Sequence, residues 1–133
     1  MSDPIHCTVV SPEAALFEGQ VEHFVAPGWN GEIGVYHLHA ALVARLGVGV
    51  VRLHSSDGAV EKIAVRGGIL QVKDDVAQLL VTEAIRGPEC DPPTIRTELE
   101  AVIESLRSPS SDDSFQELLT QRRWLEIQLV MHN

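Results

Sequence analysis

Basic residues, cysteines and long apolar runs are all scarce in this chain of 133 residues. Ten lysines and arginines stand against 19 acids, which gives a formal net charge of −9. Binding to nucleic acid needs a basic face for the phosphates, so this charge balance argues against a nucleic-acid partner. No apolar run approaches the roughly 18 residues of a membrane-spanning helix, and residues 1–4 lack the charged and apolar regions of a secretory signal. We therefore expect contact with a membrane only through another protein.

The two cysteines, Cys7 and Cys90, lie far apart in the sequence. So small a number builds no disulfide framework, and we expect two reduced thiols in an intracellular protein. Hydrophobic residues make up 44% of the chain, which is enough for a packed core. The length fits one domain, or one domain with a small appendage.

The first 85 or so residues predict short strands separated by turns. Residues 7–10 and 48–54 are rich in β-branched side chains, and Ser55-Ser56-Asp57-Gly58 is a strong hairpin turn signal. Lys73-Asp74-Asp75 predicts a further turn before a strand at 76–81. Turn signals at this spacing, with no helical pattern between them, indicate an antiparallel sandwich or barrel.

The pattern changes at Gly87-Pro88, and the rest of the chain predicts two helices. Apolar residues with helical spacing form a stripe on each predicted helix: Ile95, Leu99, Val102, Ile103 and Leu106 on the first, and Phe115, Leu118, Leu119, Leu125 and Leu129 on the second. Ser114-Phe115-Gln116-Glu117 matches a capping box and predicts the start of the second helix. A loop of about six residues between the helices favours an antiparallel hairpin.

These patterns predict an α+β protein with two parts. Residues 1–87 form an N-terminal antiparallel β-sandwich, and residues 88–133 form a C-terminal two-helix antiparallel hairpin. A two-helix hairpin buries little surface by itself, so it must pack on the sandwich or dock on a partner.

The densest group of unusual residues lies between Pro27 and His39 and contains three glycines. It is no phosphate loop, because no helix follows it and no lysine is near. His37-x-His39 has the spacing of two metal ligands on one face of a strand, to which Glu32, His23 or His54 could add a third. A small metal-binding β-barrel enzyme that uses His37 and His39 is therefore an alternative.

Other catalytic patterns are missing from the sequence. There is no Gly-x-Ser-x-Gly motif, and neither cysteine starts a helix beside a histidine. The acidic pairs Asp74-Asp75 and Asp112-Asp113 fall at predicted turn and cap positions. We predict no catalytic, cofactor-binding or metal-binding residue, and a ligand-binding sandwich with a helical lid is the second alternative.

Arg122-Arg123-Trp124 stands out on the second predicted helix of an acidic protein. Arg122 is placed to pair with Glu126 one turn later, which contributes only a few tenths of a kcal/mol. Two adjacent guanidinium groups beside an indole would also make an anchor for an acidic partner. The residues by themselves leave both interpretations open.

Five short stretches follow one another in a distinctive order between residues 6 and 87. They are Val9-Val10-Ser11-Pro12-Glu13, Phe17-Glu18-Gly19-Gln20-Val21-Glu22, Gly31-Glu32-Ile33-Gly34-Val35-Tyr36 with His39-Ala40, Ile63-Ala64-Val65-Arg66-Gly67-Gly68-Ile69-Leu70-Gln71-Val72, and Ala84-Ile85-Arg86-Gly87. In this order, followed by the helical pattern, they resemble the epsilon subunit of rotary F-type ATP synthases, which is called delta in mitochondria.

The resemblance implies a non-catalytic subunit of the central stalk. Its sandwich would bind the gamma subunit and the membrane-embedded c-ring, and so couple rotation to catalysis in the alpha/beta head. Its hairpin would restrain ATP hydrolysis by extending toward that head. The implied place is the cytoplasmic face of a bacterial membrane, reached only through the complex.

The resemblance also implies roles for particular residues. The candidates for the c-ring interface are Trp29, Asn30, Glu32 and His39, and Arg122 and Arg123 are the candidates for the inhibitory contact with the beta subunit. The Gly67-Gly68 pair would allow a sharp bend between consecutive strands.

The sequence departs from the family pattern in both of its predicted parts. The family commonly has Pro-Gly before the histidine and Pro after its alanine, where this chain has His37, Leu38 and Ala41. Some bacterial members bind ATP through Asp-x-x-Arg-Ala, and here Asp91 is followed by Thr94-Ile95 in place of Arg-Ala. That pattern is therefore incomplete in this chain.

Overall fold

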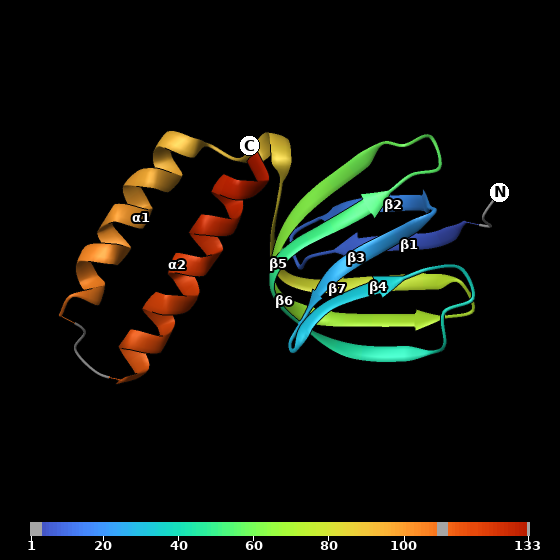
Figure 1. Ribbon diagram of the computed structural model, residues 1–133, viewed down its shortest axis with the longest axis horizontal. Coiled ribbons are helices and arrows are strands. Elements are labelled where there is room, and N and C mark those ends of the chain that lie inside the picture. Colours follow the sequence, from blue (N-terminus) through green and yellow to red (C-terminus); the bar gives the residue numbers. More distant parts are fainter. Residues whose placement is uncertain (1–3, 109–111, 133) are drawn as a thin grey trace.

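The computed structural model describes residues 4–108 and 112–132. Strands occupy the N-terminal two thirds and helices follow, as the sequence predicts (Figure 1). The elements are β1 (Ile5–Val10), β2 (Ala15–Val21), β3 (His23–Gly28), β4 (Gly31–Val35), β5 (Leu42–His54), β6 (Val60–Lys73), β7 (Val76–Arg86), the 3₁₀ turn η1 (Gly87–Glu89), α1 (Pro92–Leu106) and α2 (Asp112–His132).

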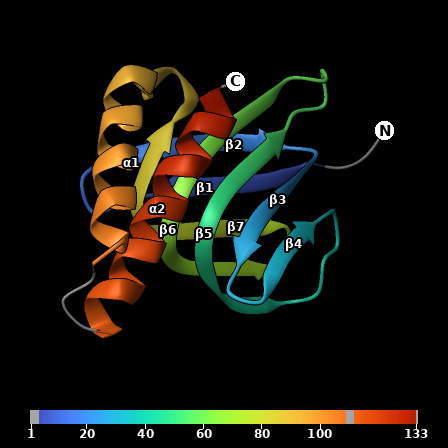
Figure 2. The ribbon, with the colours of Figure 1, turned by 60° about the vertical axis from the view of Figure 1, so that its left-hand side comes forward.

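The seven strands form one sheet in the order β2-β1-β7-β6-β5-β3-β4, and the sheet folds over into the two layers of a sandwich (Figure 1). The long strand β5 curves strongly and runs from one layer of the sandwich into the other (Figure 2). Among the described residues, every strand pairing is antiparallel except the one between β1 and β7, which is parallel. Strand patterns predict that strands exist but give no partner, so this long-range pair could not be read from the sequence.

Gly67 and Gly68 lie inside β6 rather than between two strands, which corrects the sequence-based expectation. Both have positive φ, 77° and 135°, and the pairing ladder is interrupted at Gly67. A Cβ on Gly68 would lie 2.2 Å from the carbonyl oxygen of Leu80. Only glycine fits this close approach between strands.

The main core fills the space between the two layers of the sandwich. Buried positions alternate with outward-facing ones along β1 and β7, as expected for strands with one buried face. The fully buried side chains include Ile5, Phe24, Leu53, Ile63 and Leu79. Every residue of this core comes from the strands.

A second core joins the hairpin to the sandwich. The helices α1 and α2 pack against each other, and α2 lies on β5 and β6 while α1 lies outside it (Figure 1). Val50 and Ala64 of the sheet share this core with Trp124 and Leu125 of α2. Neither helix is long and apolar enough to cross a bilayer, within the residues that the structure describes.

The structure corrects two details of the helical prediction. Helix α2 begins at Asp112, so Ser114 lies in its first turn and is not the capping residue. Ile103 and Phe115 are exposed, and Trp124 and Met131 take places in the buried core that the predicted stripe omitted. The interhelical loop falls in part on residues 109–111, which lie outside the described residues.

Candidate functional site

The tight turn between β3 and β4 presents two of the predicted c-ring residues, Trp29 and Asn30. The Trp29 side chain is 62% exposed, and the Arg45 guanidinium lies over its ring, 4.0 Å from the centroid. The backbone N–H of Trp29 also donates to the backbone carbonyl of Arg45 at 2.9 Å. This cation–π contact and hydrogen bond fix an exposed aromatic ring at the tip of a hairpin.

Glu32 lies next to this turn on β4, which is an edge strand of the sheet. Its carboxylate accepts a hydrogen bond from Arg52 of β5 at 3.2 Å. Both side chains are well exposed, so this ion pair contributes little to stability. Glu32 remains accessible to a partner.

His39 lies apart from the other three predicted c-ring residues. It belongs to the loop after β4, so the full length of that strand separates it from the Trp29 turn. Its ring Nδ1 lies 2.7 Å from the Ala40 carbonyl, to which it can donate. The structure therefore brings Trp29, Asn30 and Glu32 together and places His39 at the opposite end of β4.

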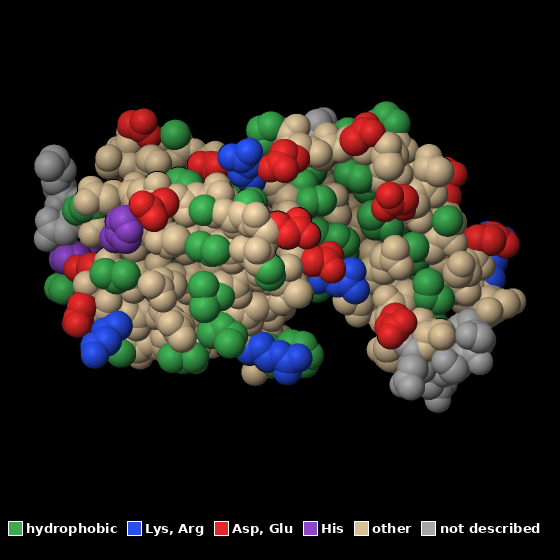
Figure 3. Space-filling model, turned by 180° about the vertical axis from the view of Figure 1, so that it is seen from behind, with side chains coloured by type: hydrophobic (Ala, Val, Ile, Leu, Met, Phe, Trp, Pro, Cys, Tyr) green, Lys and Arg blue, Asp and Glu red, His purple; other side chains and the backbone are tan. Residues whose placement is uncertain are grey.

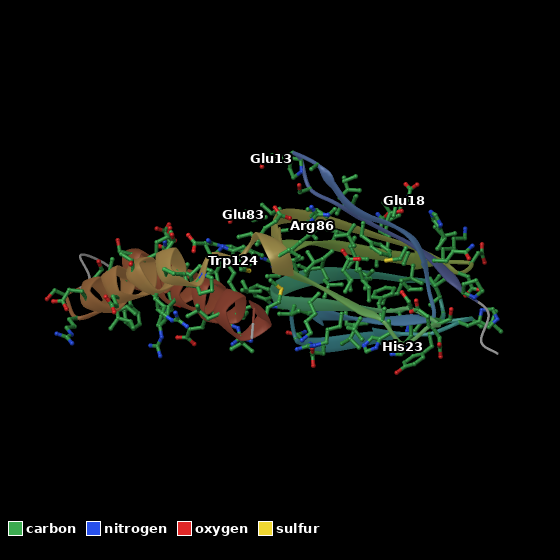
Figure 4. The ribbon with its side chains drawn as sticks, turned by 90° about the horizontal axis from the view of Figure 1, so that it is seen from above. Glu13, Glu18, His23, Glu83, Arg86 and Trp124 are labelled. Carbon is green, nitrogen blue, oxygen red and sulfur yellow. The ribbon has the colours of Figure 1, made fainter. Side chains whose placement is uncertain are left out.

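The metal-site interpretation of His37 and His39 fails on geometry. Residues 37 and 38 form a turn, so the two histidines do not share the strand face on which their spacing depends. His23 stacks on His54 with ring centroids 4.2 Å apart, on a part of the sandwich away from the helices (Figure 4). Among the described residues, no group of three or more His, Cys, Asp and Glu side chains is placed to hold a metal ion.

The two arginines on α2 and the neighbouring Trp124 have different surroundings. Arg122 Nε donates to Glu126 Oε1 at 2.7 Å, the i, i+4 pair that the sequence allows. Trp124 is only 7% exposed and belongs to the second core. The indole is therefore not accessible to a partner in the docked hairpin, whereas Arg122 and Arg123 lie on an exposed part of α2, and their contact with a partner stays a prediction.

A groove of about 440 Å³ separates α2 from the β3–β4 turn. Trp29 and Glu32 line one side, and Thr120 and Arg123 line the other. The sequence analysis assigned Trp29 and Glu32 to one interface and Arg123 to another. Nothing in the sequence could show their proximity, because about 90 residues separate them and only the docking of α2 brings them together.

An exposed ion pair lies at the junction between sandwich and hairpin. Arg86 Nε donates to Glu89 Oε1 at 2.7 Å, and this carboxylate raises the pKa of Arg86. Cys90 follows at the edge of the second core, where burial raises the pKa of its thiol. Figure 4 shows Arg86 and Trp124 on either side of this junction.

Comparison with known proteins gives one consistent result. Residues 4–87 match the family described as ATP synthase, Delta/Epsilon chain, beta-sandwich domain. The ATP synthase epsilon chain of Dichelobacter nodosus is 35% identical over 130 residues, which cover 98% of this chain and 90% of that relative. The epsilon chain of Verminephrobacter eiseniae is 38% identical over 108 residues, 81% of this chain and 78% of that one.

This chain belongs to the ATP synthase delta/epsilon family. It is a non-catalytic subunit of the rotary complex, which is membrane-associated. The two alternatives, a metal-dependent enzyme and a ligand-binding module with a helical lid, are therefore set aside.

Solved structures of ATP synthases contain chains with the fold of this epsilon-type subunit. A chain of the Euglena gracilis mitochondrial ATP synthase, solved as an OSCP/F1/c-ring assembly, superposes with a TM-score of 0.86 at 20% identity, over 98% of this chain and 82% of that one. A chain of the Tetrahymena thermophila central stalk and c-ring gives a TM-score of 0.64 at 9% identity, over 99% and 98%. At these identities the likeness concerns the fold.

The start of α1 in this epsilon-type chain differs from the ATP-binding pattern of some relatives. The Thr94 hydroxyl donates to the Asp91 carboxylate, one turn apart at the helix N-terminus. Asp91 therefore has a local partner, and Ile95, where that pattern has alanine, is buried in the second core. Of these residues, Ile95 acts in the packing of the hairpin, and Asp91 and Thr94 are exposed.

Proposed function

We propose that this chain couples the gamma subunit to the c-ring in the central stalk, and that its hairpin restrains ATP hydrolysis by the alpha/beta head. The sandwich, residues 1–87, makes the stalk contacts, and the hairpin, residues 88–133, regulates. The observation that carries the proposal is an apolar patch on the outer face of the sandwich, formed by Val43, Ile69, Val76 and Leu80.

The sheet register places the four patch residues on one face. Ile69 on β6 is paired with Leu80 on β7, and Val76 lies two outward-facing positions before Leu80. Val43 on β5 lies diagonally across from Ile69 and is 74% exposed. Hydrophobic side chains gather on the side of the sandwich seen in Figure 3.

The composition of this patch fits a permanent subunit partner. The neighbouring outward-facing residues on β5, β6 and β7 are Arg45, Gln71, Lys73, Gln78 and Thr82. None of them is acidic, although the chain carries a net charge of −9. Apolar surface without charge at its centre is typical of lasting interfaces. We assign the patch to gamma, because the polar β3–β4 turn is better suited to the loops of a c-ring.

The same proposal assigns Trp29, Asn30, Glu32 and His39 to the c-ring. The first three lie on an exposed hairpin turn and an edge strand, where polar groups remain open to a partner. Support also comes from the Euglena and Tetrahymena assemblies, which contain a c-ring together with a chain of this fold.

We place the subunit on the cytoplasmic face of a bacterial membrane. The relatives from Dichelobacter nodosus and Verminephrobacter eiseniae are bacterial, and they support this placement. The subunit would reach the membrane only through the complex.

Binding to purified gamma tests the proposed patch. Ile69→Glu combined with Leu80→Glu places two charges in it, and we expect at least about a tenfold loss of affinity, which corresponds to about 1.4 kcal/mol. Val60→Glu is the matched control, because Val60 is also on β6 and also 44% exposed but lies outside the patch. Unchanged gamma binding by the double variant, with the fold confirmed by circular dichroism, would contradict the assignment.

A further inference from the structure

The loop after β4 contains a turn whose residues do not suit it. The His39 N–H donates to the Tyr36 carbonyl at 3.1 Å, which closes a four-residue turn from Tyr36 to His39. Leu38 has a φ of 63° and His37 does not have positive φ. Positive φ at the third position alone defines a type II turn, which favours proline at the second position and glycine at the third. This chain has histidine and leucine there.

Leucine is a poor occupant of the left-handed region, because its Cβ crowds the backbone. The side chain gains little in return, since it is 77% exposed. Something outside the turn must therefore hold Leu38 in this conformation.

Asp75 supplies that hold from the β6–β7 turn. Its Oδ1 accepts a hydrogen bond from the Leu38 N–H at 2.7 Å, and its Oδ2 lies 2.7 Å from His37 Nδ1. The carboxylate thus contacts both central residues of the turn from a position 37 residues away. The bond from the Leu38 N–H is charge-assisted, and hydrogen bonds of this kind and length are among the stronger ones. The His37 Nδ1 is shielded from solvent and faces the Asp75 carboxylate, so this contact is buried beneath the turn.

Asp75 is itself fixed in place. It has a φ of 61° beside Asp74 at 51°, the conformation of a type I′ hairpin turn, which aspartate tolerates. Its carbonyl accepts the His6 N–H at 2.9 Å, which ties the turn to β1. A rigid hairpin therefore presents the carboxylate.

We propose that Asp75, acting with His37, is a positioning residue that holds the 36–39 turn in the shape in which His39 meets the c-ring. The inference rests on the proposed function, because the ring contact of His39 belongs to that proposal. The carboxylate stabilises from outside the turn the type II conformation that proline and glycine would favour from within it. A turn that contains those two residues would not need it.

This predicts a rescue. Asp75→Gly removes the carboxylate and suits the type I′ turn, so the β6–β7 hairpin is kept. We expect about a tenfold loss in binding of the subunit, complexed with gamma, to the detergent-solubilised c-ring. Adding His37→Pro and Leu38→Gly should restore the affinity to within about threefold. Asp74→Gly is the matched control, because it changes the same turn without touching the 36–39 loop, and it should bind as the unmodified chain does.

Hydrogen exchange of the His39 amide provides a readout that does not involve the ring. Exchange should accelerate in Asp75→Gly and return to its original rate in the rescued variant. If the unmodified chain fails to bind the ring while exchange still accelerates in Asp75→Gly and recovers in the rescued variant, the assignment of His39 to the c-ring is wrong. The role of Asp75 in holding the 36–39 turn would then still be supported. Unchanged exchange in Asp75→Gly, or a triple variant that does not recover, would overturn the inference.

Discussion

Two single residues of this chain adopt backbone conformations with positive φ that most residue types avoid. Gly68 is required because any side chain would collide with the backbone of the neighbouring strand β7. Leu38 takes a comparable left-handed conformation without being glycine, and an outside carboxylate holds it there. Both residues follow from the same steric rule, which the sequence satisfies in one case by residue choice and in the other by a distant partner.

Cys7 predicts a pH dependence of stability at the residue scale. Its side chain is fully buried in the main core, and burial raises the pKa of the thiol from 9.0 to about 12. Above pH 9 the unfolded chain loses this proton while the folded chain keeps it. The folded state then binds more protons, so the free energy of unfolding falls as the pH rises from 9 toward 12.

Chemical denaturation between pH 8 and pH 10.5 measures the effect of Cys7. One thiol contributes a slope of at most about 1.4 kcal/mol per pH unit. Cys7→Ala should lower the stability at pH 8 but lose this part of the slope. Equal slopes for the two proteins would contradict the prediction, because the other titrating groups are the same in both.

At the scale of elements, the local patterns of the sequence predicted most of what was formed. The strand at 76–81, the Asp74-Asp75 turn and the stripe of α1 apart from Ile103 all rest on neighbouring residues, and all are present. The features that could not be predicted depend on residues far apart in the chain. The parallel pairing of β1 with β7, the burial of Trp124 and the contact between His37 and Asp75 are of this kind. The interface residues could be nominated only through the family resemblance, since their types alone fit many surfaces.

The separation of the two cores predicts that the sandwich folds without the hairpin. Every residue of the main core lies on a strand, and only the second core needs the helices. Deleting residues 88–133 should leave a protein with a strand-type circular dichroism spectrum and full affinity for gamma, because the proposed gamma patch is upstream. The deletion would expose Val50 and Ala64, which are buried under α2 in the full chain, and this should make the fragment less soluble. An unfolded fragment would show that the second core is needed for folding.

At the scale of the whole molecule, the hairpin is attached at one end of the sandwich and can be displaced without opening the main core (Figure 1). A switch between docked and extended hairpins needs two states that differ by only a few kcal/mol. In the docked state Arg123 lines the groove beside Trp29, and Arg122 forms an exposed ion pair with Glu126. The Arg122–Glu126 pair lies within α2 and moves with the helix, and as an exposed i, i+4 pair it contributes only about 0.3–0.5 kcal/mol. The cost of displacing the hairpin therefore lies in the second core, where Val50 and Ala64 pack with Trp124 and Leu125.

Arg122→Ala combined with Arg123→Ala should therefore act on the extended state more than on the docked one. If these guanidinium groups meet acidic segments of the beta subunits, their loss weakens inhibition, and we expect ATP hydrolysis by the reconstituted complex to rise several-fold. Arg96→Ala with Arg107→Ala removes the same charge from two exposed positions, one on α1 and one directly after it, and is the matched control. Thermal unfolding of the isolated subunit should change little in either double variant. Unchanged hydrolysis, or an equal rise in the control, would mean that the α2 arginines serve only as solvated surface.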